Sequence, residues 1–421
     1  ALLTTIMAAS FAGLGEAAAP VIASYARTAF GSLNGALRTV TAPQLGAVAI
    51  KAAVFERAAP LAESVGEVFV GNVLSAGVGQ APATQAARFA GLGDATPSTT
   101  VNKVCASGAK AIAMAAQAVA LQTHACVVAG GMESMTRAPY YVPRAREGLR
   151  LGDGALVDGL VRDGLWDPYD DKHMGSCAET IAREMGISRA EQDDYAARSY
   201  ERARAARGFH AEHEIIAVEL PSKSRASSSK PVASFVADEE PAVTANGARD
   251  ALAALRPAFQ RDAAGTVTAG NASTINDGAA AVVVASRRLA RERGVHALAE
   301  IVAVADAQTD PEHFTVAPAL AIPKALAAAG LALSDVDLFE INEAFAVVAL
   351  ANAQRLGLAP DTLNVHGGAV AIGHPIGASG TRIVGTLAAA LHAGLGNVGV
   401  AAICNGGGGA TALVLRRCSP P

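Results

Sequence analysis

Two stretches of this chain follow the same order of elements, and this repeat restricts the possible folds more than any other feature of the sequence. In each stretch a short apolar strand ends at an asparagine, Asn72 in "EVFVGNVL" and Asn342 in "VDLFEINEA". Cys105 follows Asn72 by 33 residues and opens a predicted helix of small residues. His374 follows Asn342 by 32 residues and does the same. The prediction is two copies of one α/β unit whose helix starts face a shared cleft, with chance alignment of Ala-rich and Gly-rich segments as the alternative.

The rest of the chain supports an α/β architecture with buried sheets. Short apolar strands alternate with Ala-rich helical stretches, and 421 residues should divide into two or three domains. Residues 138–265 differ, because they carry charged helical runs and the Ser-rich segment "PSKSRASSSKP". These residues predict a more exposed insertion with a mobile loop.

Composition narrows the range of partners. A formal net charge of -4 and 4% aromatic residues give no reason to expect a nucleic-acid surface, so small molecules are the expected partners. The five cysteines are scattered and no pair has CxxC spacing. This pattern predicts neither a disulfide framework nor a zinc knuckle, and it favours a reducing compartment.

Two segments bear on membranes and targeting. Residues 383–415 contain no Asp, Glu, Lys or Arg, but "HAGLGN" and "CNGGGG" interrupt them, which predicts a buried helix, a turn and a buried strand rather than a membrane span. The first twenty residues lack an initiator Met, Lys and Arg. They match neither a signal peptide nor a transit peptide, and we interpret them as the stub of a processed or trimmed leader.

Cys105 and His374 are the first candidates for chemistry. A cysteine at a helix start is placed where backbone N–H groups and the helix dipole favour a thiolate, which suggests a nucleophile. A buried, inert cysteine is the alternative. His374 lies in the Gly- and Pro-punctuated turn "GGAVAIGHPIGASG", where an imidazole can act as a general base. A glycine-rich loop that binds phosphate is one alternative, but the segment lacks the GxxxxGK[ST] pattern of such loops. A zinc site formed by His366, His374 and Cys404 is another alternative.

The segment "ICNGGGGA" adds Cys404 followed by four glycines. Consecutive glycines at a strand end suit a place where a ligand lies against the backbone, and their N–H groups can form an oxyanion hole. Asn342 in "EINEAFA" offers a neutral donor for a carbonyl or a water, although it could also be an ordinary turn residue.

Seven segments taken together resemble the thiolase family, specifically its acetyl-CoA acetyltransferase branch. They are, in this order, "VNKVCASGAKAI", "GGMESM", "HMGSCAE", "NASTINDGAA", "NEAFA", "GGAVAIGHPIGASG" and "CNGGGG". The similarity runs from about residue 21 to the C-terminus. It implies a thiolase fold of two duplicated α/β domains in five αβαβα layers. The implied halves are residues 1–137 with the return segment 266–288 and residues 289–421, and residues 138–265 are the implied lid that binds CoA.

The resemblance also implies roles for the candidate residues. Cys105 matches the nucleophile that takes the acyl group, and His374 matches the base that activates it. Cys404 matches the group that moves the proton at the α-carbon of the second acetyl group. By the same match Asn342 holds a water that stabilises the enolate oxygen together with His374, and the N–H groups of Cys105 and Gly406 form a second oxyanion hole. Two cysteines are needed because one group cannot both attack a carbonyl and protonate a carbon.

Further positions match the substrate pocket of the family. The residues that match the pantetheine and thioester pocket are His173, Met174, Phe259, Ala272, Ser273 and Phe345. Two positions depart from the family pattern. Ala242 stands where an Arg is expected at the nucleotide end of CoA, so Lys223, Arg225 or Lys230 would have to meet the phosphates. His366 stands where the family often has Asn.

Within the branch, two aromatic residues resemble the mitochondrial-type enzymes. Phe314 matches a phenylalanine that leaves room for a 2-methyl group, although Thr315 replaces the proline that follows it there. Tyr200 matches a tyrosine beside a bound potassium ion. The main-chain oxygens that match the other ligands belong to Ala269, Gly270, Ala272 and Val370. Simple packing is the alternative for both aromatic residues.

The resemblance therefore implies an acetyl-CoA C-acetyltransferase (EC 2.3.1.9) that interconverts two acetyl-CoA with acetoacetyl-CoA and CoA through an acetyl-Cys105 intermediate. It implies a homotetramer without a covalently bound cofactor and without a membrane or nucleic-acid partner. The compartment is mitochondrial or cytoplasmic, with the mitochondrial one favoured by resemblance. The alternatives are a broad-specificity degradative 3-ketoacyl-CoA thiolase, a decarboxylating or carrier-linked condensing enzyme, and a non-catalytic CoA-binding protein. The direction of the reaction stays open.

Overall fold

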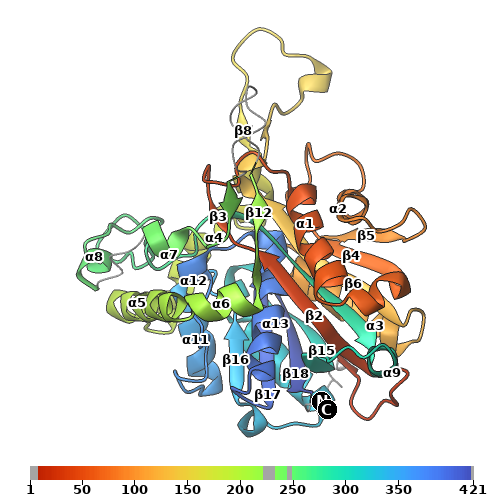
Figure 1. The fold of residues 1–421 in the computed structure, drawn as a ribbon. Helices are drawn as coiled ribbons and strands as arrows, with labels where there is room; N and C mark the ends of the chain where they lie inside the picture. Colours follow the sequence, from red (N-terminus) through yellow and green to blue (C-terminus); the bar gives the residue numbers. More distant parts are fainter. Residues whose placement is uncertain (1–7, 221–232, 244–248, 419–421) are drawn as a thin grey trace, which may run out of the picture.

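A continuous sheet with a repeated strand order forms the centre of the molecule (Figure 1). The coordinates are a computed structural model that describes residues 8–220, 233–243 and 249–418. In the first half the order is β5-β4-β6-β14-β2, with β4 parallel to both neighbours and β14 antiparallel to both. These strands are β2 (Pro20–Thr28), β4 (Glu67–Gly71), β5 (Ser98–Val101), β6 (Cys126–Ser134) and β14 (Asn276–Ser286).

The second half repeats this arrangement. Strand β16 is parallel to β17, and β18 is antiparallel to β17 and β15, while Leu363 forms a parallel bridge with Phe339 where β5 stands in the first half. The strands are β15 (Ala299–Gln308), β16 (Leu338–Ile341), β17 (Val398–Asn405) and β18 (Gly409–Arg417). Strands β2 and β15 pair at only two positions and join the halves. The duplication predicted from the sequence is therefore present.

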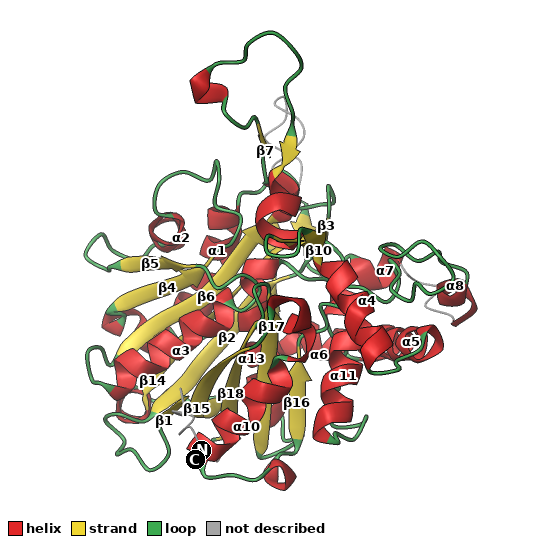
Figure 2. Ribbon diagram, turned by 180° about the vertical axis from the view of Figure 1, so that it is seen from behind, coloured by secondary structure: helices red, strands yellow, loops and turns green. Residues whose placement is uncertain are grey.

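The helices complete five layers. Helices α3 (Ser107–Ala120) and α13 (Ile376–His392) lie at the centre of the molecule (Figure 2). Their buried side chains share one cluster with strands of both halves. Helices α1 (Ala42–Lys51) and α2 (Pro82–Ala90) pack on the other face of the first half. Helices α10 (Pro318–Ala329) and α11 (Ala346–Leu356) pack on the corresponding outer face of the second half. The predicted αβαβα fold class is confirmed.

The contact between the two central helices requires a glycine. A Cβ atom on Gly108 of α3 would lie 2.4 Å from the Thr381 Oγ1 of α13 and 2.8 Å from the Thr381 backbone nitrogen. The "ASGAK" run after Cys105 is therefore small because α13 passes directly over it. This contact brings the starts of the two helices together.

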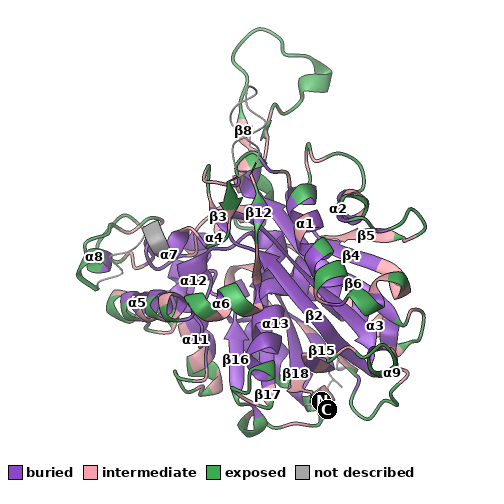
Figure 3. Cartoon of the chain, in the orientation of Figure 1, coloured by how far each residue is buried: buried purple, intermediate pink, exposed green. Residues whose placement is uncertain are grey.

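The stretch 383–415 is buried in the way the sequence predicts. Its residues form most of α13, then β17 and β18, and nearly all of these side chains lie in the core (Figure 3). Over the described ranges, no helix combines the length and apolar character that a membrane crossing requires.

The insertion consists of short strands and of helices, and one of its strands, β11, pairs with β2 of the central sheet. Helix α5 starts where the charged run predicts, because Ser188 and Glu191 form a reciprocal capping box. The Ser-rich segment and with it Lys223, Arg225 and Lys230 lie outside the described residues. The elements of the insertion are β7 (Tyr140–Tyr141), β8 (Val157–Asp158), β9 (Trp166–Asp167), β10 (Lys172–His173), α4 (Met174–Glu184), α5 (Arg189–Ala205), α6 (Arg207–His213), β11 (Ile215–Ile216), β12 (Val218–Glu219), β13 (Ser234–Phe235), α7 (Glu240–Val243) and α8 (Arg249–Ala253). The remaining elements are β1 (Ala8–Ser10), β3 (Gly31–Ser32), α9 (Arg287–Glu292) and α12 (Ala369–Ile372).

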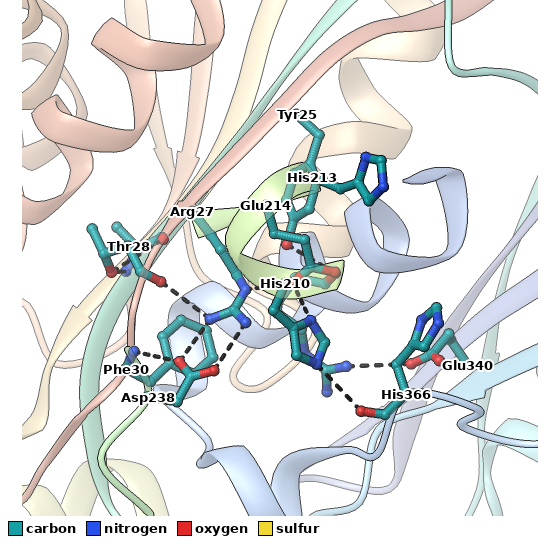
Figure 4. Close-up of polar contacts among 12 residues, drawn as sticks. Tyr25, Arg27, Thr28, Phe30, His210, His213, Glu214, Asp238, Glu340 and His366 are labelled. Carbon is teal, nitrogen blue, oxygen red and sulfur yellow. Dashed lines mark hydrogen bonds and ion pairs between the residues drawn. The ribbon is translucent and has the colours of Figure 1, made fainter. Parts of the chain in front are cut away.

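A buried ion-pair network attaches the insertion to β2 (Figure 4). Arg27 donates from Nε to Glu214 at 2.6 Å and from Nη1 to Asp238 at 2.7 Å. The ring nitrogens of His210 lie 3.0 Å from Glu214 Oε2 and 3.3 Å from the His366 carbonyl oxygen. Burial opposes ionisation of Glu214, but the charges of His210 and Arg27 outweigh it and hold the pKa of Glu214 well below its ordinary value. Buried charges thus fix two segments of the insertion to the core, in addition to the apolar contact that Val218 makes there.

Candidate active site

The loop between β5 and α3 holds Cys105 in a constrained position. The residue before it, Val104, has a φ of 48°, a left-handed conformation that a β-branched residue rarely adopts. Ser107 stabilises this loop, because its Oγ donates to the Val104 carbonyl at 2.5 Å and accepts from the Lys103 N–H at 2.9 Å. Helix α3 begins at Ser107, two residues after Cys105.

The expected stabilisation of a thiolate at this helix start is wrong for the resting protein. Burial raises the pKa of the Cys105 thiol to about 12, although hydrogen bonds from the backbone N–H groups of Gly406 and of Cys105 itself act in the other direction. Desolvation of the charged form outweighs these donors. Cys105 is therefore a neutral thiol at neutral pH and needs a base.

The imidazole of His374 adopts a defined tautomer with a lone pair that can accept a proton. Its Nδ1 lies 2.6 Å from the Oγ of Ser379, and that hydroxyl donates to the Pro375 carbonyl at 3.0 Å. The hydroxyl therefore accepts from Nδ1–H, which leaves the lone pair on Nε2. Among the described residues Nε2 has no hydrogen-bond partner. Burial, assisted by the charge of Arg382, lowers the pKa of His374 to about 3, so the imidazole is neutral.

Asn276 fixes the backbone at His374. Its side-chain oxygen accepts from the His374 N–H at 2.9 Å, and its amide donates to the Gly31 carbonyl at 3.1 Å. Gly373, with a φ of 100°, leaves the space that Asn276 occupies, because a Cβ there would lie 2.4 Å from the amide carbon. Asn276 and Ser379 are supporting residues that sequence reasoning did not single out, although both lie in quoted segments.

Cys404 and Asn342 lie together at the ends of neighbouring parallel strands, β17 and β16. Burial raises the pKa of Cys404 well above its ordinary value, and the proximity of Cys105 raises it further. Asn342 is fully buried, and among the described residues neither its Oδ1 nor its Nδ2 has a hydrogen-bond partner. A buried amide without partners costs about 1–3 kcal/mol, which marks this position as one kept for a ligand.

A cavity of about 200 Å³ opens onto Cys105 and His374. His173 stacks on Phe259 with ring centroids 4.7 Å apart, and Phe259 meets Phe345 edge-on at 6.1 Å. The predicted site residues that line the cavity are Cys105, His173, Met174, Phe259, Ala272, Ser273, Phe314, Phe345, His374 and Gly406. The structure therefore brings together ten predicted positions from both halves and the insertion. Cys404 and Asn342 are buried and are not among the residues that line it.

Sequence reasoning missed seven residues of the cavity wall. They are Met135, Gly164, Leu165, Thr274, Ile275, Ala344 and Ile376. Five of them lie within or beside the quoted segments, so their position was available but not their orientation. Gly164 and Leu165 come from an irregular helical turn of the insertion, and no pattern in the sequence marks that turn.

His366 does not belong to this cavity. Its ring stacks on Phe209 with centroids 3.9 Å apart, beside the network of Figure 4. In the described part of the chain, no three His, Cys, Asp or Glu side chains are grouped as a metal site would need. The zinc alternative with His366, His374 and Cys404 is therefore wrong.

Of the residues expected to form a potassium site, Tyr200, Gly270 and Val370 lie close together. Tyr200 is buried in one cluster with Val370, and its hydroxyl donates to the Gly270 carbonyl at 3.4 Å. Ala272 lies on the cavity wall and Ala269 is exposed. A phenol and main-chain carbonyl oxygens are suitable donors for a hard monovalent cation, so the described residues fit such an ion.

Comparison with known proteins gives consistent matches along the chain. The family models "Thiolase, N-terminal domain" and "Thiolase, C-terminal domain" match residues 20–288 and 295–417. The chain is 51% identical over 394 residues to "Acetyl-CoA acetyltransferase ERG10, cytosolic" of Gibberella zeae, covering 94% of this chain and 97% of that protein. It is 49% identical over 397 residues to "Acetyl-CoA acetyltransferase B, mitochondrial" of Xenopus laevis, covering 94% and 91%. The crystal structure of Acat5 thiolase from Ascaris suum in complex with coenzyme A superposes with a TM-score of 0.87 at 42% identity, covering 95% of this chain and 100% of that one.

Proposed function

The chain belongs to the thiolase family, and from that premise we propose that it is an acetyl-CoA acetyltransferase. It interconverts two molecules of acetyl-CoA with acetoacetyl-CoA and CoA. The observation that carries this proposal is the meeting of a neutral thiol, Cys105, and an imidazole lone pair on His374 at one small apolar cavity. The complex of the Ascaris suum thiolase with coenzyme A supports CoA thioesters as the substrate class.

In the thiolysis direction, His374 Nε2 takes the Cys105 proton while the sulfur attacks the 3-keto carbon of acetoacetyl-CoA. The oxyanion accepts hydrogen bonds from the N–H groups of Cys105 and Gly406, as an oxyanion hole requires. The C–C bond then breaks and leaves acetyl-Cys105 and the enolate of acetyl-CoA. Asn342, through a water, and His374 stabilise the enolate oxygen.

Cys404 then donates its proton to the enolate carbon, and acetyl-CoA leaves. The Cys404 thiolate takes the proton of an incoming CoA thiol, and the CoA sulfur attacks the acetyl-Cys105 carbonyl. The Cys105 sulfur leaves and recovers its proton from His374, which restores both neutral thiols. The raised pKa of Cys404 keeps this thiol protonated at neutral pH, so the proton is in place when the enolate forms.

The size of the cavity favours short acyl groups. Phe259, Phe314 and Phe345 line a space of about 200 Å³, which leaves little room for a long chain. Phe314 follows the pattern of enzymes that accept a 2-methyl branch, and we include 2-methylacetoacetyl-CoA as a proposed substrate. The alternative, a broad-specificity degradative 3-ketoacyl-CoA thiolase, requires a longer acyl tunnel.

The test compares kcat/KM for acetoacetyl-CoA, 2-methylacetoacetyl-CoA and a twelve-carbon 3-ketoacyl-CoA, following the loss of substrate absorbance after CoA is added. We expect activity on the first two substrates and very little on the third. Good activity on the twelve-carbon substrate would assign the protein to the degradative type. No CoA-dependent loss of acetoacetyl-CoA would remove the proposed function altogether.

We further propose the domain division of the sequence analysis, with the first half in residues 1–137 and 266–288, the lid in 138–265, and the second half in 289–421. The lid supplies His173, Met174 and Phe259 to the cavity, which supports a role in holding CoA. The expected Arg at position 242 is Ala242, so the nucleotide end of CoA requires another cation.

A homotetramer is part of the proposal. The hairpin based on β7 and β8 projects from the body of the molecule (Figure 1), and it carries exposed apolar residues at Leu149, Leu151 and Leu156. A projecting apolar tip of this kind suits a contact with a second copy of the chain. For the compartment we propose the mitochondrion or the cytosol, since the relatives named above include proteins designated for each.

A further inference from the structure

The duplication assigns a counterpart to the thiol of Cys404 in the first half. In the second half Ile341 of β16 pairs with Ala402 of β17, and Cys404 lies two residues beyond Ala402. In the first half Gly71 of β4 pairs with Gly131 of β6, and the residue two positions beyond Gly131 is Glu133. Glu133 therefore occupies in the first half the position that Cys404 occupies in the second.

Glu133 is fully buried and accepts four hydrogen bonds. Its Oε1 accepts from the Asn72 side-chain amide at 2.8 Å and from the Leu74 N–H at 3.1 Å. Its Oε2 accepts from the Val73 N–H at 3.0 Å and from the Gly377 N–H at 2.9 Å. Four N–H donors occupy the lone pairs of a carboxylate and leave no position for a proton. The bonded geometry is therefore that of the ionised group, and the N–H donors of Val73, Leu74 and Gly377 act against burial, which raises the pKa of Glu133 to about 7.

One of these four donors belongs to the other half of the molecule. Gly377 is the second residue of α13 and follows His374 by three positions. An anion at this helix start is favoured by the helix dipole. The approach is tight, because a Cβ on Gly131 would lie 2.0 Å from the Gly377 carbonyl oxygen. Glu133 thus holds the helix start that carries His374 against β6.

We propose that Glu133 is a positioning residue for the thiolase reaction, which holds the helix start next to His374 against the turn that follows β4 at Asn72, Val73 and Leu74. This inference rests on the function proposed above. The Glu133 carboxylate is the first-half counterpart of the Cys404 thiol. Through its hydrogen bond from Gly377, it stabilises the second half, which contains the proposed proton-transfer groups His374 and Cys404. Its negative charge also lies close enough to contribute, after burial, to the raised pKa of Cys105.

Two substitutions separate the effect of the length of the Glu133 side chain from the effect of its charge. Glu133→Gln keeps the length but turns an NH₂ group toward two of the four N–H donors. Glu133→Asp keeps the charge but is one methylene too short to hold Gly377 and Val73 together with Asn72 and Leu74. The matched control is Asp277→Asn, because Asp277 is equally buried on the neighbouring strand and its Oδ1 accepts from the Thr136 N–H at 2.9 Å.

The experiment measures kcat and the KM for CoA in thiolysis, the midpoint of urea unfolding, and the rate at which iodoacetamide alkylates Cys105 at pH 8, read by peptide mass spectrometry. For Glu133→Gln we expect kcat to fall by about 10²-fold, as for a small misplacement of reacting groups, with little change in KM and faster alkylation of Cys105. For Glu133→Asp we expect a similar loss of kcat with unchanged alkylation. Asp277→Asn should lose stability but keep kcat.

Three outcomes would overturn the proposal. One is a kcat of Glu133→Gln close to that of the wild type. Another is an equal loss of kcat and stability in Glu133→Gln and Asp277→Asn with no change in alkylation, which means a structural role alone. If Glu133→Gln does not fold, a normal kcat in Glu133→Asp is equally decisive. A wild-type protein without thiolysis activity would remove the proposed function, whereas the alkylation rates would still report on Glu133.

Discussion

The two halves of the molecule place an asparagine and a strand end at corresponding positions but use them in opposite ways. In the first half, Asn72 donates to the Glu133 carboxylate at 2.8 Å and the pair braces the fold. In the second half, Cys404 stands where Glu133 stands in the first, and the described residues offer the side-chain amide of Asn342 no hydrogen-bond partner. The comparison shows how one backbone serves two purposes. The Glu133 carboxylate accepts a hydrogen bond from the Asn72 amide, whereas the Cys404 thiol at the equivalent position leaves the Asn342 amide available to bind a ligand.

The helix starts differ in the same complementary way. Cys105 and His374 each lie two residues before a central helix. Burial shifts their pKa values in opposite directions, to about 12 for the thiol and about 3 for the imidazole. Both groups are therefore neutral at rest, as the proposed proton transfer from Cys105 to His374 requires.

Replacing Cys105 should have the largest effect on this division of roles. In Cys105→Ser we expect kcat to fall by about 10⁴-fold, because a hydroxyl is a much weaker nucleophile than a thiol and His374 then has no acidic partner. Incubation of the wild type with acetyl-CoA and peptide mass spectrometry should find an acetyl group on Cys105. An adduct on Cys404 alone would exchange the roles of the two cysteines.

The two asparagines allow a direct test of the comparison. Asn342→Ala should lower kcat by about 10²-fold, the scale of losing one oxyanion donor, while CoA still binds. Asn72→Ala should instead lower the free energy of unfolding by about 1–3 kcal/mol, because one oxygen of Glu133 loses a donor. Steady-state kinetics and urea unfolding of both variants decide the matter. Equal effects on kcat would mean that the halves are not specialised as described.

Each helix start should make stability depend on pH, by up to about tenfold in the folding equilibrium per pH unit, but in a different pH range and in the opposite direction. The pKa of His374 is lowered to about 3 by burial and Arg382, so its contribution to stability is present above its ordinary value of 6.5 and is lost as the pH falls from 6.5 towards 3. The pKa of Cys105 is raised from 9.0 to about 12, so its contribution is present below pH 9 and is lost as the pH rises.

Urea unfolding at a series of pH values measures the loss of stability below pH 6.5, the acid arm, and above pH 9, the alkaline arm. His374→Asn should make the loss in the acid arm smaller, and Cys105→Ala should make the loss in the alkaline arm smaller. His366 adds to the acid arm, because burial lowers its pKa to about 4. An acid arm that His374→Asn leaves unchanged would contradict the neutral, buried imidazole.

The smallest expected effect concerns the proposed potassium ion, for which the main-chain oxygens of Val370 and Gly270 would be ligands beside Tyr200. We propose that an ion held there orders the segment that runs into Ser273 and the cavity, with a coupling of about 1–3 kcal/mol. Potassium should lower the KM for CoA or raise kcat several-fold over sodium. Tyr200→Phe should weaken this effect without abolishing thiolysis. Equal rates in both salts would remove the ion from the account.

Much of the fold followed from local patterns in the sequence. The spacing from Asn72 to Cys105 and from Asn342 to His374 indicated two copies, and the structure has two copies. The glycine-rich segments around Cys404 and His374 indicated places of close backbone approach. Such patterns are readable because strand periodicity, helix starts and glycine tolerance depend on neighbouring residues.

Other features could not be predicted in this way. The thiolate expected at Cys105 is a neutral thiol, because its protonation depends on desolvation by distant segments. Glu133 was quoted only as a letter in "GGMESM", since its partner Gly377 lies 244 residues away. Leu165 reaches the cavity from a turn without any sequence signature.

The sequence by itself determined the order of the elements, the duplication and the identity of the reactive groups, because these depend on residue type and on short-range periodicity. Only the tertiary structure decided which asparagine is satisfied, which tautomer His374 adopts and which carboxylate holds its helix. Those properties depend on contacts between segments hundreds of residues apart and on the exclusion of water from the space between them, and no local pattern encodes either.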